Sequence, residues 1–173
     1  MTLLLCSHVK LTKLVLPGMI ARKQGHIVNT VSLAGKLFSP VRSAYCAAKS
    51  AMMFFFDSLR VEVAEQGISV TNVCPGSVAT DVARNALTGN CGKFGGSDPN
   101  IDNGMQVDRC AHLFLVAVSN GLYEAWMWGS AAERLAIYFA VYAPFVFKNL
   151  TVRYADRLCS RYRAVIDNAA KER

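Results

Sequence analysis

The sequence predicts an α/β fold built on a parallel sheet, and three observations lead to that prediction. Two short stretches rich in β-branched residues, 26–32 and 68–76, have the composition of buried strands. A long stretch with helical periodicity, 43–66, separates them, with short turns at either end. Because strands joined through a helix pair in parallel, this strand-helix-strand unit indicates a parallel sheet rather than a hairpin.

The elements before the second strand follow from periodicity and from the residues that end them. A first helix is expected from Thr2 to Lys23, bent at Pro17, and HIVNTVS, residues 26–32, forms the first strand. Ser43 is the expected N-cap of the second helix, which runs to Gln66. The central run of this helix, AMMFFF, is apolar on every side, so the helix must be covered on more than one face.

The later elements continue the alternation. ISVTNVCPG, residues 68–76, reads as a second buried strand, and residues 84–105, rich in Gly, Asn and Asp, are expected to form a loop. Within that loop a glycine cluster at 90–96 follows no strand, which favours a lid or loop over a phosphate-binding turn. A helix from Val107 to Asn120 and a strand at 123–129 complete the pattern.

Composition limits the class of protein. The chain has 173 residues and is 53% hydrophobic, which indicates a folded core and excludes disorder. Its six cysteines are scattered without a C-x-x-C pair, so reduced thiols in a non-oxidising compartment are expected and no metal site is predicted. The net charge of +7 comes mainly from the two ends of the chain, and no aromatic residues interleave with it as in a nucleic-acid platform.

An apolar run, LAIYFAVYAPFVF, occupies residues 135–147 between Arg134 and Lys148. A membrane-spanning helix needs roughly 20 apolar residues, which is more than this run contains. With the basic tail that follows, the run fits a membrane interface, and packing in a core or an oligomer is the alternative. We therefore expect two parts: residues 1–130 as a catalytic domain, and residues 131–173 as an apolar segment with a basic tail that associates with membranes. The amino terminus lacks the features of a secretory signal.

Three polar side chains are expected to meet at one edge of the sheet. Ser32 falls at the carboxyl end of the first strand, and Tyr45 and Lys49 lie one turn apart at the start of the following helix. Ligands of open parallel sheets bind at that edge. A cation beside a phenol favours the ionised form of the phenol, which makes it a usable general acid or base.

This trio fits hydride chemistry between an alcohol and a carbonyl. Tyr45 would exchange the proton, and Ser32 would hold the substrate oxygen by hydrogen bonding. Lys49 could also donate to the ribose hydroxyls of a nucleotide, while Pro75 and Gly76 would let backbone approach a nicotinamide ring. Taken alone, Y-x-x-x-K fits equally a lysine that extends past a half-buried tyrosine to reach water. Its position between a serine at one strand end and a Pro-Gly at the next is what favours a site.

The motifs V31-S32-L33-A34-G35, Y45-C46-A47-A48-K49 and N72-V73-C74-P75-G76 resemble the carboxyl-terminal half of a short-chain dehydrogenase/reductase. In finer detail the first helix resembles the branch called dehydrogenase/reductase SDR family member 7. The resemblance implies a Rossmann-like, doubly wound parallel sheet and NADP or NAD as cofactor. It implies catalytic roles for Ser32, Tyr45 and Lys49. The cofactor contacts that it implies are Lys49, Tyr45, Pro75, Gly76, Val78 and Thr80.

The resemblance also implies partners and a location. Family members often pair subunits through their two long helices, here 2–23 and 43–66, so a homodimer is expected for a full-length form. Members of this branch commonly reduce steroids, retinoids or other lipophilic carbonyls at membranes. Membrane association, with the endoplasmic reticulum as the expected location and the cytoplasm as the alternative, follows from the same resemblance.

The family's Gly-rich turn and its N-N-A-G stretch are missing from this sequence. The fold is therefore expected to be incomplete, lacking the amino-terminal nucleotide-binding strands, as in a fragment, a shortened isoform or a truncated gene product. Little or no dehydrogenase activity is expected of this chain by itself, because a hydride donor that is not held cannot be positioned. The alternative function is a non-catalytic module for dimerisation or membrane-bound interaction.

Overall fold

The structure is a computed structural model that describes residues 2–40, 42–82, 85, 98–160 and 163. The chain divides into two compact units. The first contains residues 1–75 and 111–127, and the second contains residues 76–110 and 128–173. This division comes from the structure, and the predicted boundary at residue 130 stays a prediction.

The first unit is built on a parallel sheet of three strands in the order β1-β2-β3. The strands are β1 (Gly25–Thr30), β2 (Ile68–Pro75) and β3 (Glu124–Met127). β1 pairs with β2 from Gly25 opposite Ile68 onward, and both pairings in the sheet are parallel. The expected α/β fold with a parallel sheet is therefore confirmed.

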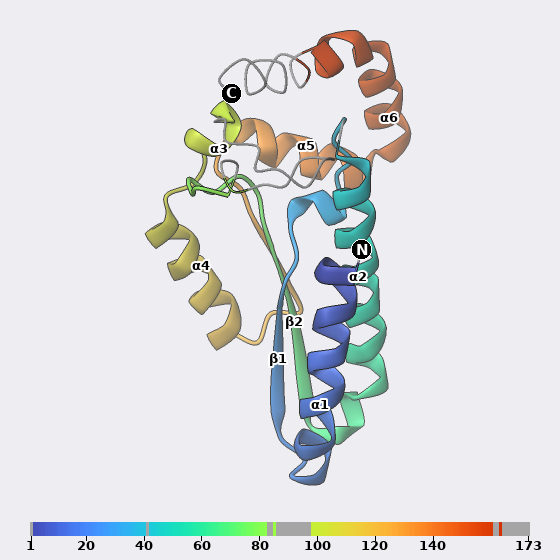
Figure 1. Cartoon of the computed structure of the whole chain (residues 1–173), viewed down its shortest axis with the longest axis vertical. Helices are drawn as coiled ribbons and strands as arrows, with labels where there is room; N and C mark the ends of the chain where they lie inside the picture. Colours follow the sequence, from blue (N-terminus) through green and yellow to red (C-terminus); the bar gives the residue numbers. More distant parts are fainter. Residues whose placement is uncertain (1, 41, 83–84, 86–97, 161–162, 164–173) are drawn as a thin grey trace. The chain divides into compact units, whose positions relative to one another are not determined.

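Helices lie on both sides of these strands. A π-helical turn, Thr2–Cys6, leads into α1 (Ser7–Ala21), and α2 (Ser43–Glu62) connects β1 to β2. α1 and α2 lie on one side of the strands, and α4 (Val107–Ser119) lies on the other (Figure 1). The covering of both sides is typical of a doubly wound sheet.

Two details of α2 differ from the prediction. Arg42, not Ser43, occupies the N-cap position, and its side chain makes no capping hydrogen bond. The α-helix ends at Glu62, and a short 3₁₀ turn, Ala64–Gln66, continues to Gly67. Gly67 has a φ of 69°, a left-handed conformation that glycine adopts without steric cost.

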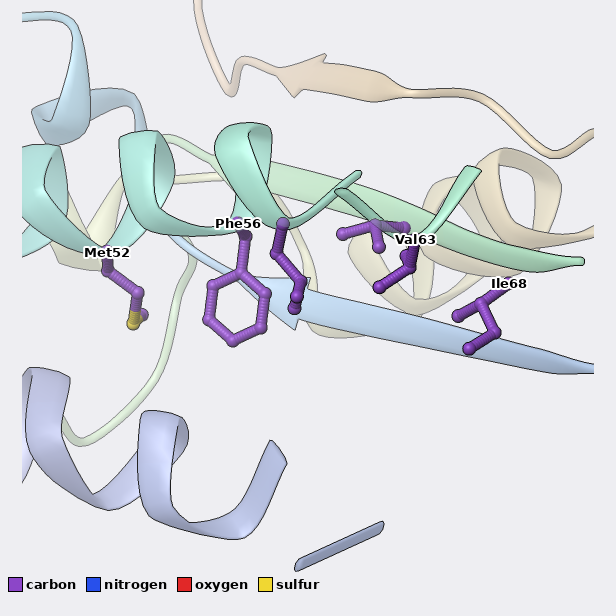
Figure 2. Close-up of a cluster of buried hydrophobic side chains, with 6 residues drawn as sticks. Met52, Phe56, Val63 and Ile68 are labelled. Atoms are coloured by element: carbon purple, nitrogen blue, oxygen red, sulfur yellow. The ribbon is translucent and has the colours of Figure 1, made fainter. Parts of the chain in front are cut away.

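The core of the first unit lies between α2 and the sheet. Six buried side chains from α2, the turn after it and β2 form one cluster: Met52, Phe56, Leu59, Val63, Ile68 and Val70 (Figure 2). Arg60 ties the same elements together, because its guanidinium donates to the Val70 and Tyr123 carbonyl oxygens and pairs with Asp57. The predicted covering of α2 is thus supplied in part by the sheet, yet Phe54 on the same helix remains 66% exposed.

A buried polar chain links β1, β2 and α2. Asn72 is fully buried; its amide accepts a hydrogen bond from Asn29 and donates to the Asp57 carboxylate and the Met53 carbonyl oxygen. Buried amides need such partners, because an unpaired one costs about 1–3 kcal/mol. These buried hydrogen bonds therefore fix how α2 is aligned against the two strands.

The second unit is mainly helical. α3 (Pro99–Asp102) is a short helix inside the stretch that was expected to be loop, and the glycine cluster at 90–96 lies outside the described residues. The apolar run 135–147 is not one segment, because it is divided between α5 (Ala131–Tyr142) and α6 (Pro144–Arg153). Proline has no amide hydrogen and its ring obstructs a continuous helix, so α5 ends before Pro144 and a new helix begins there.

One helical stretch of the described chain, Leu4–Ala21, is long and apolar enough to cross a membrane. Only 6% of that stretch is buried. Length and apolar character alone do not separate a membrane helix from a helix covered by a protein partner.

Candidate active site

Ser32 joins the ends of the first two strands. β1 ends at Thr30, so Ser32 lies just past the strand and not within it as predicted. Its Oγ accepts a hydrogen bond from the Ala34 amide at 3.2 Å and donates to the Pro75 carbonyl oxygen at 3.3 Å. Because Pro75 is the last residue of β2, the serine hydroxyl is fixed at the carboxyl edge of the sheet.

Tyr45 and Lys49 lie one turn apart in the first turns of α2, and the Lys49 side chain reaches the end of β1. The Lys49 Nζ donates to the Thr30 carbonyl oxygen at 3.1 Å and lies 5.9 Å from the centre of the Tyr45 ring. Lys49 is only 8% exposed, whereas Tyr45 is 37% exposed. Among the described residues no hydrogen bond involves the Tyr45 hydroxyl, so this group is available to a ligand that approaches from solvent.

Burial sets the electrostatics of the site. It lowers the pKa of the Lys49 ammonium, an effect that the neighbouring Cys74 opposes. Burial, and secondly the charge of Glu124, raise the pKa of the Cys74 thiol to about 12. Because that thiol is protonated at neutral pH, it supplies little negative charge to Lys49 there, and desolvation is the dominant effect.

The three predicted groups are therefore anchored at one place. Ser32 and Lys49 bond to carbonyl oxygens at the ends of β2 and β1, and the Tyr45 ring centre lies 5.9 Å from the Lys49 amine. This arrangement depends on parallel pairing, since antiparallel strands would send the two carboxyl ends to opposite edges. The arrangement places the Ser32 hydroxyl and the Tyr45 phenol near the buried Lys49 amine.

The remaining predicted cofactor contacts belong to the second unit. Val78 forms a parallel bridge with Met105, and the Ala79 amide donates to the Met105 carbonyl oxygen at 2.9 Å. The Thr80 hydroxyl donates to the Val78 carbonyl oxygen at 3.3 Å, and Thr80 is exposed. Roles for Gly76, Val78 and Thr80 in holding a cofactor stay a prediction.

The sequence did not reveal two parts of the site. The Thr30 carbonyl oxygen anchors the lysine, and as a backbone group it leaves no mark in residue identity. The Ser50 hydroxyl donates to the Gly35 carbonyl oxygen at 2.7 Å and so holds the turn after Ser32 against α2. The position of Ser50, directly after Lys49, is the only sequence signal for that contact.

Comparison with known proteins places this fold and site in a class. The profile of the family described as short chain dehydrogenase matches residues 1–90. The chain belongs to the short-chain dehydrogenase family. The match confirms, at the level of the family, the resemblance to short-chain dehydrogenases that the motifs around Ser32, Tyr45 and Pro75 indicated.

Curated relatives narrow the comparison. The chain is 42% identical over 120 residues to the Homo sapiens protein "Dehydrogenase/reductase SDR family member 7", covering 69% of this chain and 35% of that protein. It is 40% identical over 152 residues to the Anopheles gambiae "Dehydrogenase/reductase SDR family protein 7-like", covering 88% of this chain and 48% of that one. The expected likeness to the member 7 branch is confirmed, and the chain spans between about a third and a half of the length of these relatives.

Solved structures agree on the fold. A short-chain dehydrogenase from Sphingobium yanoikuyae in complex with NADPH matches with a TM-score of 0.59 at 27% identity, over 72% of this chain and 46% of that one. A short-chain dehydrogenase from Streptomyces avermitilis matches with a TM-score of 0.62 at 21% identity, over 89% of this chain and 58% of that one. The chain therefore has the Rossmann-like α/β fold predicted from the sequence.

Proposed function

We propose that this protein is an NAD(P)-dependent oxidoreductase that interconverts an alcohol and a carbonyl on a lipophilic substrate, such as a steroid or a retinoid. One observation carries the proposal: a buried lysine amine, held on the Thr30 carbonyl oxygen, lies beside a partly exposed tyrosine at the carboxyl edge of a parallel sheet. Membership of the short-chain dehydrogenase family supports the same reaction class.

In this proposal each side chain acts on the substrate oxygen. The Tyr45 hydroxyl gives a proton to a carbonyl oxygen during reduction and takes one from an alcohol during oxidation. The Lys49 ammonium stabilises the phenolate that remains after reduction. Ser32 donates a hydrogen bond to the same substrate oxygen after its hydroxyl rotates away from Pro75.

The donor set at the site fits the nicotinamide and ribose end of a dinucleotide. Lys49 has three N–H donors and uses one of them on Thr30, which leaves donors for ribose hydroxyls. The backbone at Pro75 and Gly76 offers polar groups for the carboxamide. When bound, the cofactor supplies or accepts the hydride. NADPH is present in the Sphingobium yanoikuyae relative, which supports NADP alongside NAD as the candidates.

The fit does not extend to the pyrophosphate. A dinucleotide fold holds that group on a glycine-rich turn after a strand, and the sequence contains no such turn. We therefore expect this chain alone to be weakly active or inactive. Titration with NADPH followed by protein fluorescence checks this expectation, and saturable binding at micromolar concentration would contradict it.

The half-cofactor, reduced nicotinamide mononucleotide, provides the sharper test because it requires no pyrophosphate or adenine site. With this donor at high concentration and a lipophilic ketone, Tyr45→Phe should lower the rate of reduction by about 10²–10⁴-fold. Tyr123→Phe is the matched control, because Tyr123 is 71% exposed and its ring contact with Arg60 survives loss of the hydroxyl. Equal rates for Tyr45→Phe and the control would reject the site.

The second candidate function is a non-catalytic module for dimerisation or membrane-bound interaction. A shallow groove between α1 and α2 favours it, because Leu5, Val9, Phe54 and Phe55 line the groove beside Lys10 and Lys13. Exposed apolar surface of this kind is typical of interfaces. A homodimer through α1 and α2 predicts that Phe54→Asp shifts the chain from dimer to monomer in light scattering. Ketone reduction that persists in that monomer would favour the enzyme over the module.

A further inference from the structure

α5 and α6 are consecutive helices that meet at an angle (Figure 1), and this pair, called the α5–α6 hairpin below, buries little of its own apolar surface. The two helices contact each other and meet at Ala143, and Pro144 is the first residue of α6. Ile137 is the only residue of the two helices that is fully buried, at 0% exposure. The hairpin therefore presents most of its apolar side chains to the surface.

On α5 the exposed side chains follow one face of the helix. Leu135, Phe139 and Tyr142 are 57%, 47% and 73% exposed, and their spacing of four and three residues places them in one stripe. Spacing of this kind normally marks the face that a helix buries. Here each of the three side chains keeps about half or more of its surface exposed, although Tyr142 stacks on Tyr138 and Phe139 lines an apolar hollow with Phe147 and Leu150 of α6.

On α6 apolar and basic side chains share a face. Phe145 and Val152 are 79% and 74% exposed, and Lys148 lies between them at helical spacing. Val146 and Leu150, each 46% exposed, form the neighbouring stripe. A lysine on such a stripe can lay its methylene stem along apolar surface and keep its ammonium in a polar layer.

The charge on this hairpin and on the residues directly after it, up to residue 160, has one dominant sign. Among described residues 131–160 there are four exposed basic side chains, Arg134, Lys148, Arg153 and Arg157. The same stretch has two acids, and one of them, Glu133, accepts hydrogen bonds from the Ser77 and Gly129 amides. Asp156 is left as the exposed acid, so the hairpin carries net positive charge around its apolar stripes.

We propose that the α5–α6 hairpin binds the surface of a lipid bilayer that contains anionic lipids. Its exposed apolar side chains would enter the headgroup boundary, while Lys148, Arg153 and their neighbours contact lipid phosphates and carboxylates. The inference deepens the proposed membrane association by naming the surface and the lipid class. It does not rest on the catalytic roles of Ser32, Tyr45 and Lys49.

Helix length decides between lying on the bilayer and crossing it. α5 has 12 residues and α6 has 10, which correspond to about 18 Å and 15 Å at 1.5 Å per residue. The hydrocarbon core is about 30 Å thick, so neither helix spans it. Amphipathic helices that lie in the interface need only reach about 5–10 Å into the headgroup boundary.

The test is co-flotation of the full chain with vesicles of phosphatidylcholine alone, or of phosphatidylcholine mixed with phosphatidylserine. We expect stronger binding to the anionic vesicles and weaker binding as salt rises. Phe145→Ser with Val152→Ser should lower partitioning at least about tenfold on anionic vesicles. Lys148→Gln with Arg153→Gln should lower it about 25-fold, at about fivefold for each basic residue.

The matched controls are Leu14→Ser on α1 and Val61→Ser on α2, which are 79% and 78% exposed and should bind as the unchanged chain does. Loss of binding in Leu14→Ser but not in the Phe145 variant would overturn the proposal in favour of the apolar α1 stretch. Absence of vesicle binding, with the hairpin variants changing oligomeric state instead, would overturn it in favour of a protein partner.

A measurement on the unchanged chain guards against variants that fail to fold. The chain has two tryptophans, Trp126 in β3 and Trp128, and the Trp128 ring lies 6.3 Å from Tyr138 of α5, so the Trp128 share of the emission reports on this helix. Brominated lipids in anionic vesicles should quench tryptophan emission, and unquenched emission from vesicle-bound chain would count against the hairpin. Both readouts follow lipid binding and not ketone reduction, so failure here is distinguishable from failure of the proposed catalytic function.

Discussion

Three consecutive phenylalanines of α2 provide a graded test of where the core lies. Successive helical residues point about 100° apart, and here Phe54, Phe55 and Phe56 are 66%, 36% and 2% exposed. The Phe56 ring lies within the buried cluster around Met52 and Ile68 (Figure 2). It also makes an edge-to-face contact with Phe55, the ring centres being 5.3 Å apart.

Phe56→Ala should lower the free energy of unfolding by about 3–5 kcal/mol, from lost apolar burial and the cavity left behind. Small domains have about 5–15 kcal/mol of stability in total, so this change removes a large part of it. Phe54→Ala is the matched control on the same helix. It should change stability by less than about 0.5 kcal/mol, since its ring is mostly in water and alanine favours the helix.

Urea unfolding followed by far-UV circular dichroism measures both variants, with the midpoint and slope fitted separately. The Phe56→Ala midpoint should fall while the slope stays near that of the unchanged chain. Equal losses for the two variants, or a greater loss for Phe54→Ala, would show that α2 buries a different face and would refute the assignment of the core.

Three further predictions concern residues in or next to the sheet. Burial raises the pKa of the Cys74 thiol to about 12, against an ordinary 9.0. Between pH 9 and pH 12 the thiol therefore ionises in the unfolded state but not in the folded state, and the free energy of unfolding falls by up to about 4 kcal/mol. Cys74→Ala should remove this loss in urea titrations run at successive pH values. Burial lowers the pKa of the Lys49 amine, so its charged form destabilises the folded state at neutral pH, and this loss of stability disappears as the pH rises towards 10.5. Lys49→Met should therefore be at least as stable as the unchanged chain at pH 7, and the difference in stability between the two should become smaller at alkaline pH. Gly67→Ala should lower the free energy of unfolding by more than about 1 kcal/mol, because the φ of Gly67 is 69° and the added methyl would press on the Lys23 carbonyl oxygen. An unchanged free energy of unfolding in urea titration would contradict that conformation.

Sequence patterns predicted the elements whose signals are local. β-branched runs marked β1 and β2, and helical spacing marked α2, so parallel pairing followed from connectivity alone. Patterns failed where a boundary depends on backbone geometry. Ser43 is a good capping residue by type, yet the helix begins one residue earlier and leaves it inside the first turn. The run 135–147 is uniformly apolar, and composition alone did not show that Pro144 divides it into two packed helices.

The candidate site was predicted in part for the same reason. Residue identity and spacing were enough to place Ser32, Tyr45 and Lys49 at one edge of the sheet. The groups that hold them there are the carbonyl oxygens of Thr30 and Pro75, which every residue type carries. Only folded coordinates show which of the many backbone oxygens accept those bonds.

The burial of Lys49 argues for function over structure. Lys49 is 8% exposed as a whole residue, and its amine makes one hydrogen bond, to Thr30, with a protonated thiol at Cys74 beside it. No carboxylate forms an ion pair with it among the described residues, so burying its charge is not offset as in a salt bridge. An apolar side chain of the same length would fill this space at less cost. A residue that is unfavourable for folding, and whose amine lies 5.9 Å from the centre of the Tyr45 ring, is better explained by the proposed chemistry than by the packing it provides.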